Sequence, residues 1–157
     1  MLNQSRVADR WIFLSKGVTA TEQTWDDGTS SIARFFEQGD FCTNLTSAWT
    51  REIASDDLVA ITDVAGMSVP DEIIRHEYLQ GGEFGRYIRL KLMEGHLFAK
   101  ELICAKNSSR ISMRYQFLER FQPDLLDSVS QKDIARFLGV TPQGLNRFLR
   151  QQKSDAS

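Results

Sequence analysis

Short apolar runs separated by glycine and aspartate turns fill the first part of the chain. Strand-favouring residues occupy 11–14, 18–25, 32–36, 51–54 and 58–62. The segments Asp26-Asp27-Gly28 and Gln38-Gly39-Asp40 are typical of tight turns, and the first is a hairpin signal. Many short strands joined by such turns indicate a sandwich or a roll.

The middle of the chain changes to helical periodicity. Pro70 can start a helix that Gly81-Gly82 ends. A long helix is predicted from Glu83 to about Ala105, with apolar residues on more than one face. Such a helix can serve both its own domain and a partner, and the alternative is that it packs wholly inside one subunit.

One stripe on this long helix is a candidate surface for pairing with a second copy of the chain. It consists of Phe84, Ile88, Gly95, Phe98 and Leu102. Gly95 would let a second helix approach closely, because glycine has no side chain. We therefore expect a homodimer formed along this helix.

The C-terminal third predicts a further helix over 110–121, after a break at 107–109, and then a helix-turn-helix over 130–150.

Ser130 and Asp133 have the spacing of a capping box. Ile134, Phe137 and Leu138 give the first helix one apolar face, as Leu145, Phe148 and Leu149 give the second. Small Ala135 lies where the helices must cross closely, and Val140 fills the turn. Gly139 suits a left-handed turn, and Thr141-Pro142 suits the start of the second helix. The alternative is a helical hairpin that packs on another element.

Polar residues on the outer face of the second helix match what major-groove reading requires. They are Gln143, Asn146, Arg147 and Arg150. Gln143 suits adenine, Arg147 suits guanine, and Asn146 suits a base or a phosphate. Gln131, Lys132 and Thr141 stand at helix starts, where phosphates bind. The alternative for each residue is a solvated polar side chain.

The net charge of −2 hides an asymmetry between the two parts of the chain. Residues 1–105 carry 10 Lys and Arg against 16 Asp and Glu, and residues 106–157 carry 9 against 5. Phosphate neutralisation dominates affinity for DNA, so the split favours DNA binding at the C-terminal end. A chance fluctuation of surface charge is the alternative.

Composition narrows the function classes further. A hydrophobic content of 41% and a charged content of 25% are ordinary for a soluble domain. No apolar run approaches the roughly 20 residues of a membrane span, and no signal peptide is visible, so we expect no membrane contact. Cys42 and Cys104 do not suggest a secreted disulfide scaffold, so we expect a cytoplasmic protein. We expect Cys42 and Cys104 to be buried structural thiols, with redox sensing as the alternative. We expect His76 and His96 to be surface or packing residues, with a haem or metal role as the alternative. No catalytic set stands out, so we expect neither an enzyme nor a resident metal or cofactor.

The order of a roll, a long helix and a helix-turn-helix resembles the Crp/Fnr family of bacterial transcription regulators. The resemblance is most specific in VSQKDIARFLGVTPQGLNRFLR and extends upstream through RYQFLERFQPDLLDSVS. Lys16-Gly17-Val18 and Gly39-Asp40-Phe41 match strand and turn motifs of the family's cyclic-nucleotide-binding roll. The resemblance implies a sequence-specific DNA-binding regulator that acts as a homodimer on double-stranded DNA, with RNA polymerase as a candidate partner. It also places Gln143 and Arg147 toward the bases.

The sequence departs from the family in three places. Only ten residues precede Trp11, so we expect a partial roll or one that a partner strand completes. Thr43-Asn44 replace the Gly-Glu pair that binds the ribose, and neither Thr46-Ser47-Ala48 nor Arg51-Glu52-Ile53 supplies the arginine triplet that binds the phosphate. Because a buried phosphate would then be unpaired, we do not expect cyclic-nucleotide binding. The chain ends seven residues after Arg150, so we expect no β-hairpin wing.

These observations together predict an α+β fold. It comprises a partial double-stranded β-roll over 1–82, a long dimerisation helix over 83–106 and a helix-turn-helix domain over 107–157. The effector is not named by the sequence. Two rival functions stay open. One is a ligand-sensing or protein-interaction module whose helix-turn-helix does not bind DNA, and the other is a cyclic-nucleotide sensor with an unusual cassette.

Overall fold

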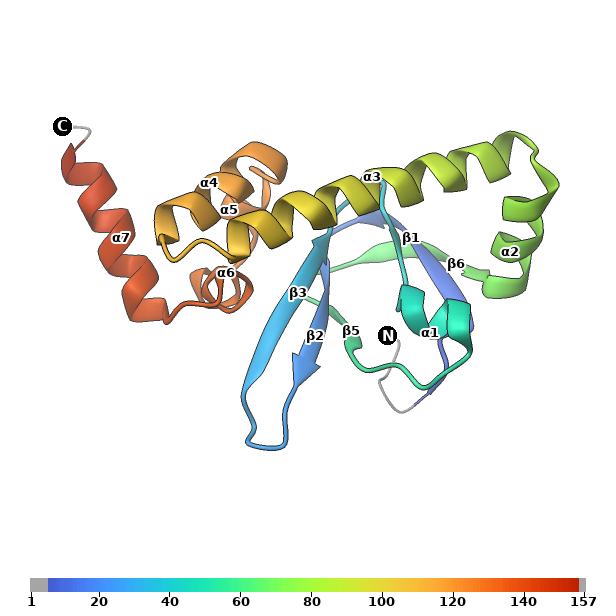
Figure 1. Cartoon of the computed structure of the whole chain (residues 1–157), viewed down its shortest axis with the longest axis horizontal. Coiled ribbons are helices and arrows are strands. Elements are labelled where there is room, and N and C mark those ends of the chain that lie inside the picture. Colours follow the sequence, from blue (N-terminus) through green and yellow to red (C-terminus); the bar gives the residue numbers. More distant parts are fainter. Residues whose placement is uncertain (1–5, 156–157) are drawn as a thin grey trace. The chain divides into compact units, whose positions relative to one another are not determined.

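The computed structural model describes residues 6–155. The chain divides into two compact units, 1–96 and 97–157, and the boundary falls inside one long helix, α3 (Glu83–Lys106) (Figure 1). The first unit combines strands and helices. Apart from α3, regular structure in the described part of the second unit consists of four further helices.

Two small antiparallel sheets form the roll of the first unit. One has the strand order β4-β1-β6, from Phe41–Cys42, Arg10–Lys16 and Ala65–Pro70. The other has the order β3-β2-β5, from Ser30–Phe36, Thr19–Thr24 and Asp57–Ala60. The predicted mixed fold of strands and helices is therefore confirmed.

Both predicted turns of the roll are formed. Gly28 has φ +79° at the β2–β3 hairpin, and Gly39 has φ +90° between β3 and β4. Glycine reaches such angles without the steric cost that other residues carry, so the chain can reverse tightly there. At the hairpin, the Asp27 carboxylate accepts hydrogen bonds from the Thr29 hydroxyl and backbone N–H, and these bonds lower the pKa of Asp27.

Buried apolar side chains hold the first unit together in two clusters. Leu14, Phe36, Cys42 and Leu58 pack between the sheets. A second cluster joins Trp11 of β1 to Ile74 of helix α2 (Asp71–Gln80) and Ile88 of α3. Each cluster links segments that are far apart in sequence, so burial of these side chains fixes how strands and helices pack in this unit.

The structure corrects the prediction over residues 43–54. The predicted strand at 51–54 is wrong, because these residues have no regular structure and follow a short helix, α1 (Leu45–Thr50). Asn44 begins α1 by accepting a hydrogen bond from the Ser47 N–H, and Arg51 ends it with φ +65°. The left-handed backbone at Arg51 interrupts the extended conformation that a strand over 51–54 would need. Strands β4 and β6 are too short or too irregular in pattern to be predicted.

The helices of the middle segment are confirmed. Helix α2 follows directly on Pro70 and ends at Gly81, which has φ +80°. Helix α3 covers the predicted range within one residue. None of the helices in residues 6–155 is long and apolar enough to cross a membrane.

Four helices follow α3 in the second unit. They are α4 (Ile111–Phe121), α5 (Leu125–Ser128), α6 (Gln131–Leu138) and α7 (Pro142–Asp155). Their buried side chains form the interior of this unit, and include Phe117, Leu118, Leu125, Phe137 and Leu145. Helix α4 ends before Pro123, as predicted.

Candidate nucleic-acid interface

Helix α6 begins with the predicted cap. The Ser130 hydroxyl accepts a hydrogen bond from the Asp133 N–H at 3.1 Å and donates to the Asp133 carboxylate at 2.7 Å. This carboxylate also pairs with Arg136 at 3.0 Å, one turn later on the same helix. Asp133 therefore binds two side chains of its own segment, which differs from a standard capping box, where it would bind the Ser130 backbone.

The turn between α6 and α7 has helix-turn-helix geometry. Gly139 takes the left-handed conformation at φ +66°, and the Val140 N–H donates to the Ala135 carbonyl at 3.0 Å, which closes the end of α6. The Thr141 hydroxyl then accepts a hydrogen bond from the Gly144 N–H at 3.1 Å and caps α7, with Pro142 as its first residue. The predicted roles of Gly139, Thr141 and Pro142 are therefore confirmed.

One face of each helix is buried against the other, which leaves the opposite face of α7 open. Ile134 and Leu138 of α6 and Leu145 of α7 are buried. Phe148 contacts the Tyr115 ring of α4 edge-on, with 5.4 Å between ring centres, and burial raises the pKa of Tyr115. The inner face of α7 is thus fixed by apolar contacts, so its outer side chains have a defined direction.

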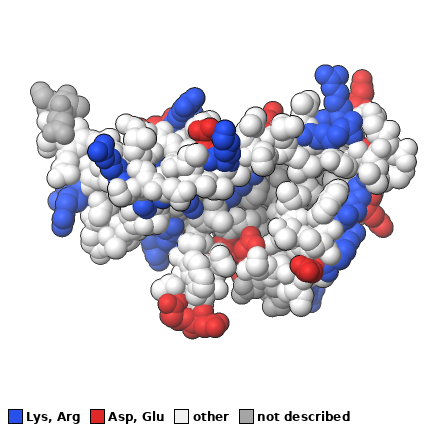
Figure 2. All heavy atoms as spheres, viewed as in Figure 1, with Lys and Arg blue, Asp and Glu red and all other residues white. Residues whose placement is uncertain are grey.

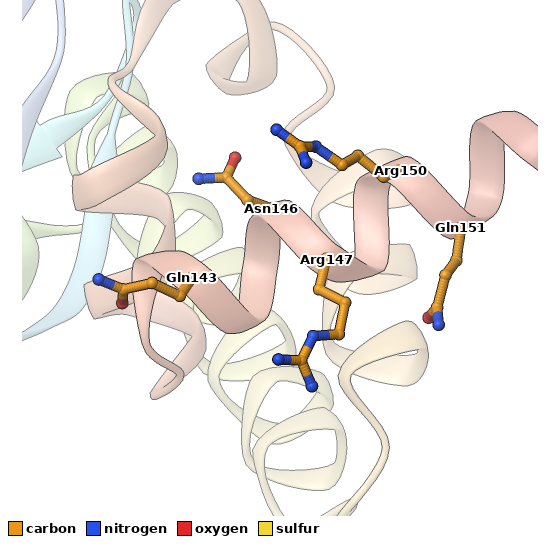
Figure 3. Close-up of a pocket in the computed structure, with 5 residues that line it drawn as sticks. All are labelled: Gln143, Asn146, Arg147, Arg150 and Gln151. Carbon is orange, nitrogen blue, oxygen red and sulfur yellow. The ribbon is translucent and has the colours of Figure 1, made fainter.

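Five polar side chains on the outer side of α7 line an open pocket (Figure 3). They are Gln143, Asn146, Arg147, Arg150 and Gln151. All five are exposed and project from the same helix. Sequence reasoning found four of them and missed Gln151. The spacing of four residues from Arg147 was the signal that could have found it.

The three predicted phosphate contacts lie at helix starts. Gln131 and Lys132 are exposed in the first turn of α6, and Thr141 is exposed at the start of α7. The Thr141 hydroxyl already accepts one hydrogen bond as a cap. A hydroxyl can accept and donate at once, so capping is compatible with a phosphate contact.

The two units differ in the charged residues that their surfaces carry. Between Pro142 and Ser154 the sequence has no acidic residue. In the view of Figure 2, blue Lys and Arg atoms predominate over the helices that follow α3, whereas red Asp and Glu atoms gather at the tip of the β2–β3 hairpin. Asp26 and Asp27 lie at that tip. The electrostatic environment suited to a polyanion is therefore on the helical unit.

Polar residues at the position of the nucleotide cassette make contacts inside the first unit. Thr43 donates to the Arg10 carbonyl at 2.9 Å. Asn44 caps α1 with its oxygen and donates its amide to Asp56. Arg51 pairs at 2.8 Å with Asp71, which is almost wholly buried. The residues that would have to bind a ribose and a phosphate are therefore engaged within the fold.

The predicted dimerisation stripe on α3 faces its own chain at most of its positions. Ile88 packs with Trp11 and Ile74. A Cβ at Gly95 would lie 3.1 Å from the Arg34 guanidinium, whose pKa is lowered by burial. In the second unit, Leu102 is buried and the Phe98 ring contacts Phe117 edge-on at 5.0 Å. Only Phe84 of the five is clearly exposed, so most of the predicted stripe is covered by its own chain.

The open face of α3 carries another set of apolar residues. Leu90, Met93 and Leu97 are each more than half exposed, and they recur at intervals of three and four residues. Cys104 follows seven residues after Leu97 and is also exposed, so the expectation of a buried thiol there is wrong. This periodicity is typical of a seam between two helices.

The remaining candidate residues lie apart from this interface. Cys42 is buried, as expected, and burial raises the pKa of its thiol to about 11. His76 and His96 are both exposed. Within residues 6–155, no three His, Cys, Asp or Glu side chains are close enough to share a metal ion.

Solved structures of bacterial regulators resemble this chain over nearly its whole length. FixK2 from Bradyrhizobium japonicum has a TM-score of 0.72 and 16% identity, and the match covers 94% of this chain and 76% of FixK2. The regulator CLP from Xanthomonas campestris has a TM-score of 0.69 and 14% identity over 97% of this chain and 81% of CLP. A regulator of the Crp/Fnr family from Eubacterium rectale has a TM-score of 0.65 and 16% identity over 96% of this chain and 71% of that protein.

No protein-family model and no curated protein matches the sequence. The matched part is nearly the whole chain, so it includes this chain's two sheets, its long helix and its helix-turn-helix. The chain therefore has the fold of the Crp/Fnr regulators, as the motifs in its sequence predicted.

Proposed function

We propose that this chain is a sequence-specific, DNA-binding transcription regulator that acts as a homodimer in the cytoplasm. The observation that carries the proposal is the outer side of α7. It presents exposed amides and guanidinium groups on a segment with no acidic residue between Pro142 and Ser154, and buried contacts fix the inner side of the helix. Such a rigid polar face suits base edges in the major groove.

Four of the five exposed residues of this face, together with three residues at helix starts, have a proposed role. Arg147 forms a bidentate pair with guanine, and Gln143 does so with adenine. Asn146 and Arg150 contact a base or a phosphate, while Gln131, Lys132 and Thr141 bind phosphates at helix N-termini, where N–H groups and the helix dipole favour anions. Side chains of α7 would thus contact the bases, and phosphate contacts at the start of α6 would fix the position of α7 along the duplex.

We propose that two copies pair through the open face of α3. Leu90, Met93 and Leu97 would be buried in the pair, in place of the stripe predicted from the sequence. Two recognition helices could then enter successive major grooves about 34 Å apart, on a two-fold symmetric site. In this scheme residues 1–82 form the effector-like roll, 83–106 the dimerisation helix and 107–157 the DNA-binding domain. Recruitment or exclusion of RNA polymerase would follow from the bound site.

The proposed regulator does not use a cyclic mononucleotide. This part of the proposal is supported by the contacts of Arg51, which pairs with Asp71, and of Asn44, which binds within its own segment. Among the regulators with a similar structure, CLP is responsive to a different nucleotide, c-di-GMP. Calorimetry with cyclic AMP, cyclic GMP and c-di-GMP tests all three ligands on this chain. Micromolar binding of either mononucleotide would contradict this part of the proposal.

The experiment that tests the main proposal is selection of bound duplexes from a random pool. The affinity for the most enriched duplex is then measured at increasing salt concentrations. We expect a two-fold symmetric motif, with affinity that falls steeply as salt rises, because each phosphate contact releases counterions. Weak binding at low salt without enrichment of any motif would contradict the proposal. It would favour the rival in which the protein is an interaction module.

A further inference from the structure

Arg114 of α4 connects two segments that the sequence separates. Its Nε donates to the Ser108 carbonyl, in the loop after α3, at 2.9 Å. Its Nη1 donates to the Leu138 carbonyl at 2.8 Å and also lies 3.4 Å from the Gly139 carbonyl, in the helix-turn-helix turn. One half-buried guanidinium therefore bridges the end of the long helix and the turn that aims α7.

The Leu138 and Gly139 carbonyls are good acceptors for a cation. They stand at the C-terminal end of α6, where carbonyls have no partner within the helix and the helix dipole is negative. A planar guanidinium can donate in two directions from fixed positions, whereas the ammonium group of lysine is a single point charge. Arginine is thus suited to hold both segments at once.

A second cation reinforces the same junction. Lys106, in the last turn of α3, has its ammonium 4.6 Å from the centre of the Phe137 ring on α6. Burial, and then the nearby Arg114, lower the pKa of Lys106, which agrees with the two cations lying close together. The end of α3 is therefore joined to α6 by a cation–π contact and, through the loop that follows α3, by the Arg114 bridge.

We infer that Arg114 is a positioning residue that sets the direction of α7 relative to the end of α3. This inference rests on the proposed function. In a dimer paired along α3, the direction of each α7 determines which separation of half-sites both helices can occupy together. Arg114 would thus determine how strictly the protein selects the spacing of its site, without touching DNA.

The test uses the full-length chain and duplexes that carry the selected half-sites at the best spacing and at one or two base pairs more or fewer. Arg114→Ala and Arg114→Lys are compared with Arg110→Ala, which removes the same charge from an exposed position just before α4. We expect the wild type and Arg110→Ala to keep a sharp preference for one spacing. We expect Arg114→Ala to lose about tenfold in affinity at the best spacing and less at the others, because charge-assisted bonds are lost at the junction. The affinity of Arg114→Lys at the best spacing should lie between those of the wild type and Arg114→Ala.

Loss of folding alone would give another result. It would lower affinity by the same factor at every spacing, and that outcome, or an unchanged spacing profile in Arg114→Ala, would overturn the inference. Amide hydrogen exchange without DNA gives an independent reading: in Arg114→Ala, but not in Arg110→Ala, exchange at Val140 should accelerate while exchange in the core of α4 stays slow. Equal exchange at Val140 in both variants would overturn the inference. A wild type that selects no two-fold motif would overturn the proposed function first, and it is recognised without any variant.

Discussion

The cassette segment (residues 43–56) and the outer face of α7 contain similar polar residues in opposite settings. Asn44 is buried, and both ends of its side-chain amide are bonded within the segment. Asn146 is exposed on α7 and lines an open pocket with its neighbours. Arg51 pairs with a buried carboxylate, whereas Arg147 projects to solvent.

This comparison teaches that residue type alone does not make a binding site. A buried polar group has to be hydrogen-bonded, because leaving it unpaired costs on the order of 1–3 kcal/mol. The cassette segment meets that requirement from inside its own unit, so its polar atoms stabilise the fold. The polar atoms of α7 are hydrated, so they can exchange water for a ligand at little cost. Changes in the first set should therefore affect stability, and changes in the second should affect affinity.

The largest expected effect is on stability, from Asp71→Ala. The Asp71 carboxylate accepts from the Trp11 indole at 2.8 Å and pairs with Arg75 at 2.6 Å and with Arg51. Its loss leaves three donors without their acceptor, and we expect about 3 kcal/mol of destabilisation, at the lower end for buried pairs because both arginines keep some contact with water. Urea unfolding measures this change.

The helix-turn-helix should be spared by this substitution. The Leu145 region would keep its own core, and affinity for the selected duplex, measured well below the unfolding midpoint, should change less than twofold or so. If the variant were as stable as the wild type, the interior of the roll would not depend on its polar network. That result would contradict the view that buried polar groups in this unit stabilise the fold.

The next effect is on affinity, from Arg147→Ala. We expect a loss of about 1–3 kcal/mol on the selected site and a relaxed preference at one base pair, because a bidentate pair to guanine is removed. The unfolding free energy should hardly change, since the side chain is exposed. Binding of duplexes with each base at that position measures the effect, with Arg110→Ala as the charge control. Equal losses for all four bases would reassign Arg147 to a phosphate.

The smallest effect is on the pH dependence of stability, and it tests whether water is excluded from the interior of the roll. The pKa of Cys42 is raised to about 11 from 9.0, chiefly by burial, so the folded state holds the thiol proton more tightly than the unfolded state. The resulting stabilisation is fully present below pH 9 and is lost as pH rises toward 11. We expect Cys42 to account for about 1 kcal/mol of lost stability between pH 9 and 10. Unfolding of the wild type and of Cys42→Ala at both pH values measures this share, and Cys104→Ala, which removes an exposed thiol, is the control. An equal pH slope in all three proteins would show that the interior is hydrated.

The accuracy of the sequence-based prediction differed between the same two regions for a physical reason. The helix-turn-helix is specified by local signals, namely Ser130, Gly139 and Thr141-Pro142, and each acts within a few residues. Around 43–54 the outcome depends on contacts with distant segments, such as the Ser47 hydroxyl, which accepts from the Ala8 N–H. A stretch of sequence does not reveal such partners. For α3, periodicity found apolar stripes but could not tell which one the chain itself would cover.

Gly95 places two selective pressures in opposition within α3. Alanine would favour the helix by about 1 kcal/mol at an interior position. Its methyl group would also meet the Arg34 guanidinium at 3.1 Å, closer than ordinary contact. The guanidinium is the far end of a long side chain, so it would have to move by only a few tenths of an ångström to admit the methyl group. How firmly the roll holds Arg34 therefore decides whether alanine at position 95 strengthens or weakens α3, and this one contact couples the helix to the roll.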